Sequence, residues 1–180
     1  ESLIYLDELN ELTFLALTNK NDNFSKNIIN AGINATSQLN AIKKFIELNE
    51  IKKTIFLTPD VSFRNEIEKA ISNSKIKILE NYIYNTDPTK LTKQIEKITR
   101  YEIRKQNLED EINRLEKSEQ NNKERLIERL KKRDTLGSVK FDSVVISDFD
   151  ESLKSVTTSL LYTDISPKEK YFITLNQWFD

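Results

Sequence analysis

The stretch that decides the fold is Lys53-Thr-Ile-Phe-Leu-Thr-Pro-Asp60, followed directly by Val61-Ser-Phe-Arg-Asn-Glu-Ile-Glu-Lys-Ala-Ile71. Its first half is a short run of apolar and β-branched residues that stops at a proline, which predicts a buried strand. In its second half apolar residues recur at the spacing of one helix face. The loop between them is expected at the carboxyl end of the strand, where open α/β sheets place their ligand crevice. We expect Asp60 or Ser62 to cap the helix.

The same alternation of strand and helix continues along the chain. Right-handed βαβ units are therefore expected, with a parallel sheet covered on both faces, which is an α/β fold. Helices are predicted after the strands and at 36–48, and residues 12–18 and 28–33 are expected to add two short strands. The four strands of the main sheet are predicted at residues 54–58, 76–83, 143–147 and 171–175.

A long charged segment, residues 89–133, interrupts this pattern and contains neither Pro nor Gly. A single straight helix of this length would be about 65 Å long. Two sparse apolar sets flank the polar stretch 118–122, so we favour an antiparallel helical hairpin that turns there over a single helix. The stem up to Ile98 is expected to be buried, whereas the segment from about Arg104 to Leu126 has too few apolar residues to bury against a sheet.

The arginines of this segment could bind a negatively charged partner. Six of the seven arginines of the chain lie in it, and Arg125, Arg129 and Arg133 share one helix face. A basic helix can bind nucleic acid or anionic lipid, but the interleaved glutamates favour a solvated surface. The formal net charge of the whole chain is −1, so no overall field favours nucleic acid or an anionic membrane.

The residue inventory argues against catalysis. The chain has no Cys and no His, which excludes disulfides, thiolate nucleophiles and the usual near-neutral general base. Its two glycines form no phosphate-binding loop, so a flavodoxin-like enzyme is disfavoured. Asp148 and Asp150 could form a carboxylate pair, but an N-cap carboxylate with Glu151 three residues on is the favoured interpretation. We predict no enzyme activity, no cofactor and no metal.

Strand-end loops supply the candidate ligand-binding residues. Tyr82 and Tyr84 could line the same crevice, although core packing is the favoured interpretation for them. No run of about 18 apolar residues could span a membrane. Since the chain begins at Glu1, we expect it to be part of a longer protein whose targeting or anchoring segment lies outside it. The predicted ligand-binding residues are Thr18, Asn19, Pro59, Asp60, Asp148 and Trp178.

Several short motifs, taken in order, resemble the type I periplasmic binding-protein family. The chain is most similar to the penicillin-binding protein activators and the branched-chain amino-acid binding proteins, and the charged insertion favours the activators. One departure is that Phe63 is followed by Arg64, where the family tends to have an aromatic residue and then Gly. The matching pieces are Leu15-Ala-Leu-Thr-Asn19, Ala31-Gly-Ile-Asn34, Ile55-Phe-Leu-Thr-Pro-Asp60, Arg133-Asp-Thr-Leu-Gly137, Phe141-Asp-Ser-Val-Val-Ile-Ser-Asp148 and Thr174-Leu-Asn-Gln-Trp178.

The resemblance implies both an architecture and a function. Residues 1–33 would end a first lobe and residues 34–180 would form a second lobe, with the helical insertion at about 100–134. The protein would be a non-catalytic regulator of cell-wall synthesis, in the periplasm or as an outer-membrane lipoprotein of a Gram-negative bacterium. It would act by contacting a peptidoglycan synthase or another envelope protein, or by sensing a small-molecule ligand. The alternative is the solute-binding component of an ABC transporter for amino acids or similar molecules.

Overall fold

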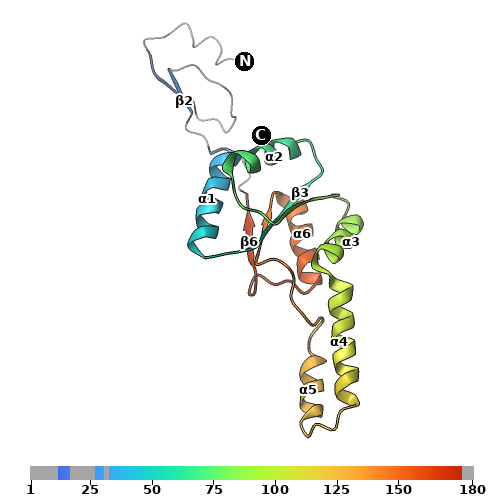
Figure 1. The fold of residues 1–180 in the computed structure, drawn as a ribbon. Helices are drawn as coiled ribbons and strands as arrows, with labels where there is room; N and C mark the ends of the chain where they lie inside the picture. The colour runs from blue at the N-terminus through green and yellow to red at the C-terminus, as the bar shows by residue number, and fades with distance from the viewer. Residues whose placement is uncertain (1–11, 17–26, 31–32, 176–180) are drawn as a thin grey trace. The chain divides into compact units, whose positions relative to one another are not determined.

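The computed structural model describes residues 12–16, 27–30 and 33–175 of the chain (Figure 1). The chain divides into two compact units. The first comprises residues 1–50, 61–77 and 175–180, and the second comprises residues 51–60 and 78–174.

The second unit is built on a four-stranded sheet whose strands are all parallel, as the sequence predicted. The strand order is β4-β3-β5-β6, so the two central strands are β3 and β5. Every residue of these two strands is buried, whereas the edge strands β4 and β6 are partly exposed. The strand bounds are Thr54–Pro59 for β3, Glu80–Tyr84 for β4, Ser143–Ile146 for β5 and Tyr171–Thr174 for β6.

The predicted strand at 76–83 begins later than expected. Residues 76–79 are not a strand, and β4 starts at Glu80. The amide of Leu79 donates to the carbonyl oxygen of Thr54 at 2.7 Å, which sets the chain alongside β3 before regular pairing begins. The apolar run therefore marks burial at Ile76 and approach to the sheet, but not strand geometry over its whole length.

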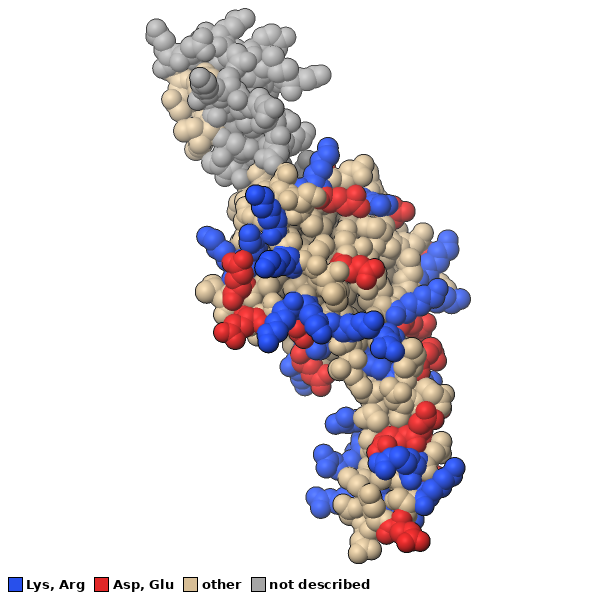
Figure 2. Space-filling view, in the orientation of Figure 1, with Lys and Arg blue, Asp and Glu red and all other residues tan. Residues whose placement is uncertain are grey.

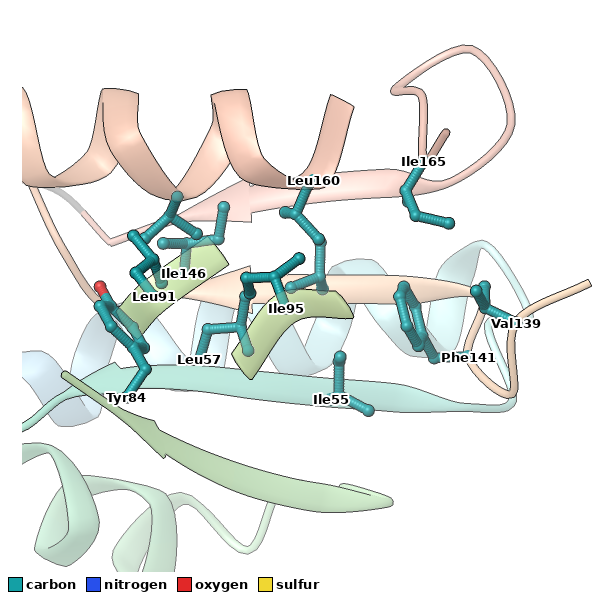
Figure 3. Close-up of a cluster of buried hydrophobic side chains, with 12 residues drawn as sticks. Ile55, Leu57, Tyr84, Leu91, Ile95, Val139, Phe141, Ile146, Leu160 and Ile165 are labelled. Atoms are coloured by element: carbon teal, nitrogen blue, oxygen red, sulfur yellow. The ribbon is translucent and has the colours of Figure 1, made fainter. Parts of the chain in front are cut away.

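Two helices of the second unit, α3 (Pro88–Thr99) and α6 (Asp150–Tyr162), pack against each other and on the sheet (Figure 3). The carboxylate of Asp87 caps α3 by accepting from the amides of Thr89 and Lys90 at 3.1 and 3.0 Å. The buried core that results combines side chains of the strands and of both helices, and Ile98 packs against it as predicted. Its members are Ile55, Leu57, Tyr84, Leu91, Ile95, Val139, Phe141, Val144, Ile146, Val156, Leu160 and Ile165.

The first unit contains two helices that pack against each other, α1 (Ala35–Leu48) and α2 (Arg64–Ser74). The side chain of Asn34 caps α1 by accepting from the amide of Ser37 at 2.9 Å. Phe63 holds the N-cap position of α2, so the expectation that Asp60 or Ser62 would occupy it was wrong. Two short strands, β1 (Phe14–Ala16) and β2 (Ile28–Asn30), pair in parallel within the predicted ranges.

The charged segment folds as a helical hairpin, as predicted. In Figure 1 the hairpin extends away from the sheet of its unit. The first helix does not continue from α3, however, because Arg100 takes a left-handed backbone conformation, with φ of 54°, that separates α3 from the hairpin. The hairpin consists of α4 (Tyr101–Glu116), a turn at residues 117–122 and α5 (Lys123–Leu130).

Candidate functional site

The carboxyl edge of the sheet brings three predicted site residues to the same end of the strands. Pro59 ends β3 and pairs in register with Tyr84, the last residue of β4. The next amide, that of Asp60, donates to the carbonyl oxygen of Tyr84 at 2.9 Å. Asp148 follows the end of the neighbouring strand β5. Pro59 and Asp148 are buried, and Asp60 is exposed.

Asp148 lies at the centre of a hydrogen-bond network at this edge. Its carboxylate accepts the phenol hydroxyl of Tyr84, the hydroxyl of Ser152 at 2.5 Å and the amide of Phe149 at 2.9 Å. The N-cap position of α6 belongs to Phe149, so the prediction that Asp148 would be the N-cap residue was wrong. The acidic first turn that the sequence predicted is present, with Asp150 and Glu151.

The network encloses the Asp148 carboxylate, which therefore has a structural role rather than a role in binding a ligand. Asp148 is only 4% exposed and Tyr84 is fully buried. The pKa of the Tyr84 phenol is raised well above its ordinary value, first by burial and then by its hydrogen bond to the Asp148 carboxylate. A phenol that stays protonated and donates permanently to Asp148 fixes β4 to the end of β5. The carboxylate oxygens are thus already used within the protein.

The structure brings together half of the predicted ligand-binding residues. Thr18, Asn19 and Trp178 lie outside the described residues. Beside Asp148, the Ser147 hydroxyl is buried and has no hydrogen-bond partner within the part of the chain that the structure describes. No cluster of three or more metal-ligating side chains occurs among the described residues.

A second concave site lies in the hairpin, between α4 and α5. It is a groove of about 280 Å³ with an apolar floor and a charged rim. On the rim, Arg114 forms a two-pronged pair with Glu111, at 2.7 and 2.6 Å. This pairing lowers the pKa of Glu111 and raises that of Arg114. The groove is lined by Glu111, Arg114, Leu115, Gln120, Leu126, Arg129, Leu130 and Arg133.

Sequence reasoning predicted that the hairpin would serve as a docking surface, but it interpreted its basic helix face as solvated and predicted no groove. The related signal in the sequence was the helix face predicted for Arg125, Arg129 and Arg133. In the structure α5 ends at Leu130, before Arg133, and of these three arginines Arg129 and Arg133 line the groove. The two apolar sets that favoured a hairpin do cover each other, but incompletely: Leu115 is only 3% exposed, whereas Leu126 and Leu130 are half-buried beside it. The two helices therefore leave an apolar floor open between charged side chains.

The base of the hairpin is fixed by Arg104, whose burial the sequence did not predict and which is only 4% exposed. Its guanidinium donates to the carbonyl oxygen of Thr99 at 3.0 Å, to the hydroxyl of Thr135 at 2.9 Å and to the carbonyl oxygen of Thr163. The Thr135 hydroxyl in turn donates to Asp164 at 2.6 Å. Burial lowers the pKa of Arg104, and the nearby Asp164 carboxylate opposes that effect. The charge is buried because each of its hydrogen-bonding edges has a partner.

The chain that leaves the hairpin returns to the same point. The amide of Leu136 donates to the carbonyl oxygen of Arg104 at 2.9 Å. Gly137 follows with φ of +113°, a conformation that side-chain-bearing residues rarely adopt. A Cβ there would also contact side-chain atoms of Asn107 and Arg104, at 3.6 and 3.8 Å. The loop at 134–137 thus closes the hairpin onto its own base.

Comparison of the chain with family models, with curated proteins and with solved structures gives no match. Among the helices of the described residues, none combines the length and the apolar character that crossing a bilayer requires.

Proposed function

We propose that the chain is a non-catalytic protein of the Gram-negative envelope that acts by protein contact through its hairpin. On this proposal it is related to the penicillin-binding protein activators, works in the periplasm or on the outer membrane, and contacts a peptidoglycan synthase. The observation that carries the proposal is the hairpin itself, which extends from its unit and holds an open groove with an apolar floor.

The way the hairpin is built supports a role in contact rather than in stability. Its base is firmly held by Arg104 and Leu136, yet no residue of α5 is fully buried. An isolated helix of eight residues is marginal in water, so α5 depends on packing for its stability. A rigid stem that carries an incompletely packed helix is suited to docking, because a partner can supply the missing cover.

The chemistry of the sheet edge supports the non-catalytic part of the proposal. Asp148 is enclosed by three donors, and the chain contains neither His nor Cys. An acid–base or nucleophilic reaction at this edge would need a group that is free to exchange protons near neutral pH. The alternative, an amino-acid binding component of a transporter, is supported by the position of Pro59 and Asp60 at the end of β3, where parallel sheets place ligands.

The test is a variant in which residues 109–131 are replaced by a short Gly-Ser bridge. This replacement keeps Arg104, the Thr135 hydroxyl and the Leu136 amide, so the base of the hairpin remains closed. Affinities of the intact chain and of the variant for purified peptidoglycan synthases of the source bacterium are measured by biolayer interferometry. The proposal expects the variant to bind at least about tenfold more weakly, which corresponds to about 1.4 kcal/mol.

A second arm separates the two functions. Isothermal titration calorimetry with free leucine reports amino-acid binding in the intact chain and in the hairpin variant. Equal synthase affinity for the two proteins refutes docking through the hairpin. Leucine binding that is unchanged by removal of the hairpin supports the transporter component instead.

A further inference from the structure

The charges of the hairpin are only partly neutralised within it. In the described part of the chain, each ion pair of this region joins residues that are close in sequence: Arg114 pairs with Glu111, and Lys132 pairs with Glu128. None joins α4 to α5, and Arg129 and Arg133 take part in no ion pair with another described residue. Residues 123–133 hold six Lys and Arg side chains against two Glu. In Figure 2 basic side chains lie along the α5 side of the hairpin, and others lie on its α4 side.

The groove combines this excess of positive charge with an apolar floor. Leu115, Leu126 and Leu130 line it, and Arg129 and Arg133 stand four residues apart on its rim. Since Arg114 is already paired with Glu111, the two free guanidinium groups decide the charge that an occupant meets. Arginine guanidinium groups bind carboxylates in a planar, two-pronged geometry.

We infer that this groove binds an acidic, amphipathic helix of a partner protein. The apolar face of that helix covers Leu115, Leu126 and Leu130, and a pair of its Asp or Glu side chains at helical spacing binds Arg129 and Arg133. A third helix completes the cover of α5, whose apolar residues Leu126, Ile127 and Leu130 are only half-buried in the hairpin alone. Laying an apolar helix face into a hydrophobic groove is a recurrent mode of recognition.

A second copy of this chain is the competing occupant. Its α4 carries Glu102, Glu109 and Glu116 at seven-residue spacing, and all three are exposed. By helical geometry this acidic stripe lies on a different side of α4 from the groove residues Glu111 and Arg114. A contact between the stripe of one copy and the groove of the next would join two different surfaces, which generates rings or open filaments rather than a closed dimer. Because a contact between copies would not close into a dimer, we favour a different protein as the occupant of the groove.

This inference rests on the proposed function, because it names the chemistry of the partner that docks on the hairpin. Its probe is a synthetic amphipathic peptide of about 18 residues, a length at which a helix is stable enough to populate, with Leu on one face and Glu on the other. The control peptide has Lys in place of every Glu. Binding to the intact chain is measured by fluorescence anisotropy at low and at high salt.

The acidic peptide is expected to bind, to weaken as salt rises and to lose at least about tenfold in affinity with either Arg129→Glu or Arg133→Glu. The Lys peptide is expected not to bind. Arg100→Glu is the matched control, since it makes the same charge change at an exposed residue outside the groove, and it should leave affinity within about twofold. Circular dichroism checks that each variant keeps its helices.

Equal binding of both peptides, binding of neither, or an affinity that Arg129→Glu leaves unchanged overturns the inference. Concentration-dependent growth in mass of the intact chain that Arg129→Glu abolishes, measured by light scattering, assigns the groove to a second copy and overturns it as well. If removal of residues 109–131 weakens synthase binding while Arg129→Glu and Arg133→Glu do not, the proposed function stands and only the assignment of the groove falls.

Discussion

Replacement of Arg104 by methionine tests the claim that one buried cation holds the hairpin to its unit. Methionine keeps most of the length and the apolar stem of the side chain but removes the guanidinium. The carbonyl oxygens of Thr99 and Thr163 then lose a charged donor, and so does the hydroxyl of Thr135. Arg104 is only 4% exposed, so water has little access to these acceptors in the native state.

The magnitude follows from these three contacts. A hydrogen bond to a charged group contributes about 1.5–3 kcal/mol, and a buried acceptor left without a donor costs about 1–3 kcal/mol. The Thr135 hydroxyl keeps its hydrogen bond to Asp164, so the cost of removing its donor is at the lower end of that range. Removing the cation also removes part of the desolvation cost of burying it, which reduces the total loss of stability from the three contacts. We expect Arg104→Met to lower the free energy of unfolding by about 3 kcal/mol, and Arg104→Lys, which keeps the charge, by about half as much.

Urea unfolding followed by circular dichroism measures this loss. Lys105→Met is the matched control, since it removes a positive charge from the adjacent, exposed residue of the same helix, and it should change the free energy of unfolding by less than about 0.5 kcal/mol. If Arg104→Met is as stable as Lys105→Met, then Arg104 does not fix the base of the hairpin and the account of its burial is wrong.

Three further predictions concern the sheet edge and the hairpin. Burial raises the pKa of Tyr84 in the folded chain, so the unfolded chain loses that proton first and the free energy of unfolding should fall as pH rises above about 10. In urea titrations, Tyr84→Phe should reduce the slope of this fall by up to about 1.4 kcal/mol per pH unit. Asp148→Asn should cost about 1–3 kcal/mol in the same assay at neutral pH, because its amide nitrogen cannot accept the bonds from Tyr84 and Ser152; an unchanged midpoint would contradict the network. Replacing residues 109–131 by a Gly-Ser bridge should lower the free energy of unfolding by less than about 2 kcal/mol, whereas a chain that fails to fold would make the hairpin part of the core.

The sheet could be predicted from the sequence because strands that are buried on both faces consist mainly of apolar residues. Strands β3 and β5 are buried at every position, so their residues, apart from Ser143 at the start of β5, form apolar and β-branched runs of strand length. The start of β4 could not be placed, since Ile76 is buried without being in a strand. The turn of the hairpin was predictable because a polar stretch separates two apolar sets.

The base of the hairpin and the candidate site depend on contacts between distant parts of the chain. The guanidinium of Arg104 is buried only because Thr135 and Thr163, 31 and 59 residues further on, offer acceptors. Asp148 is enclosed because Tyr84, 64 residues earlier, donates to it. The break at Arg100 has no local signal either, because neither Gly nor Pro marks it. Local periodicity carries no information about such pairs.

Site-specific photo-cross-linking in living cells tests the central claim most directly. A photoreactive amino acid is placed at Gln120, on the rim of the groove, and separately at Asp60, an exposed residue at the edge of the sheet. Mass spectrometry identifies what each position captures. The account predicts that Gln120 cross-links to another envelope protein and that the Asp60 position does not. Cross-links from Asp60 with none from Gln120 would contradict the assignment of the hairpin as the surface through which this protein acts.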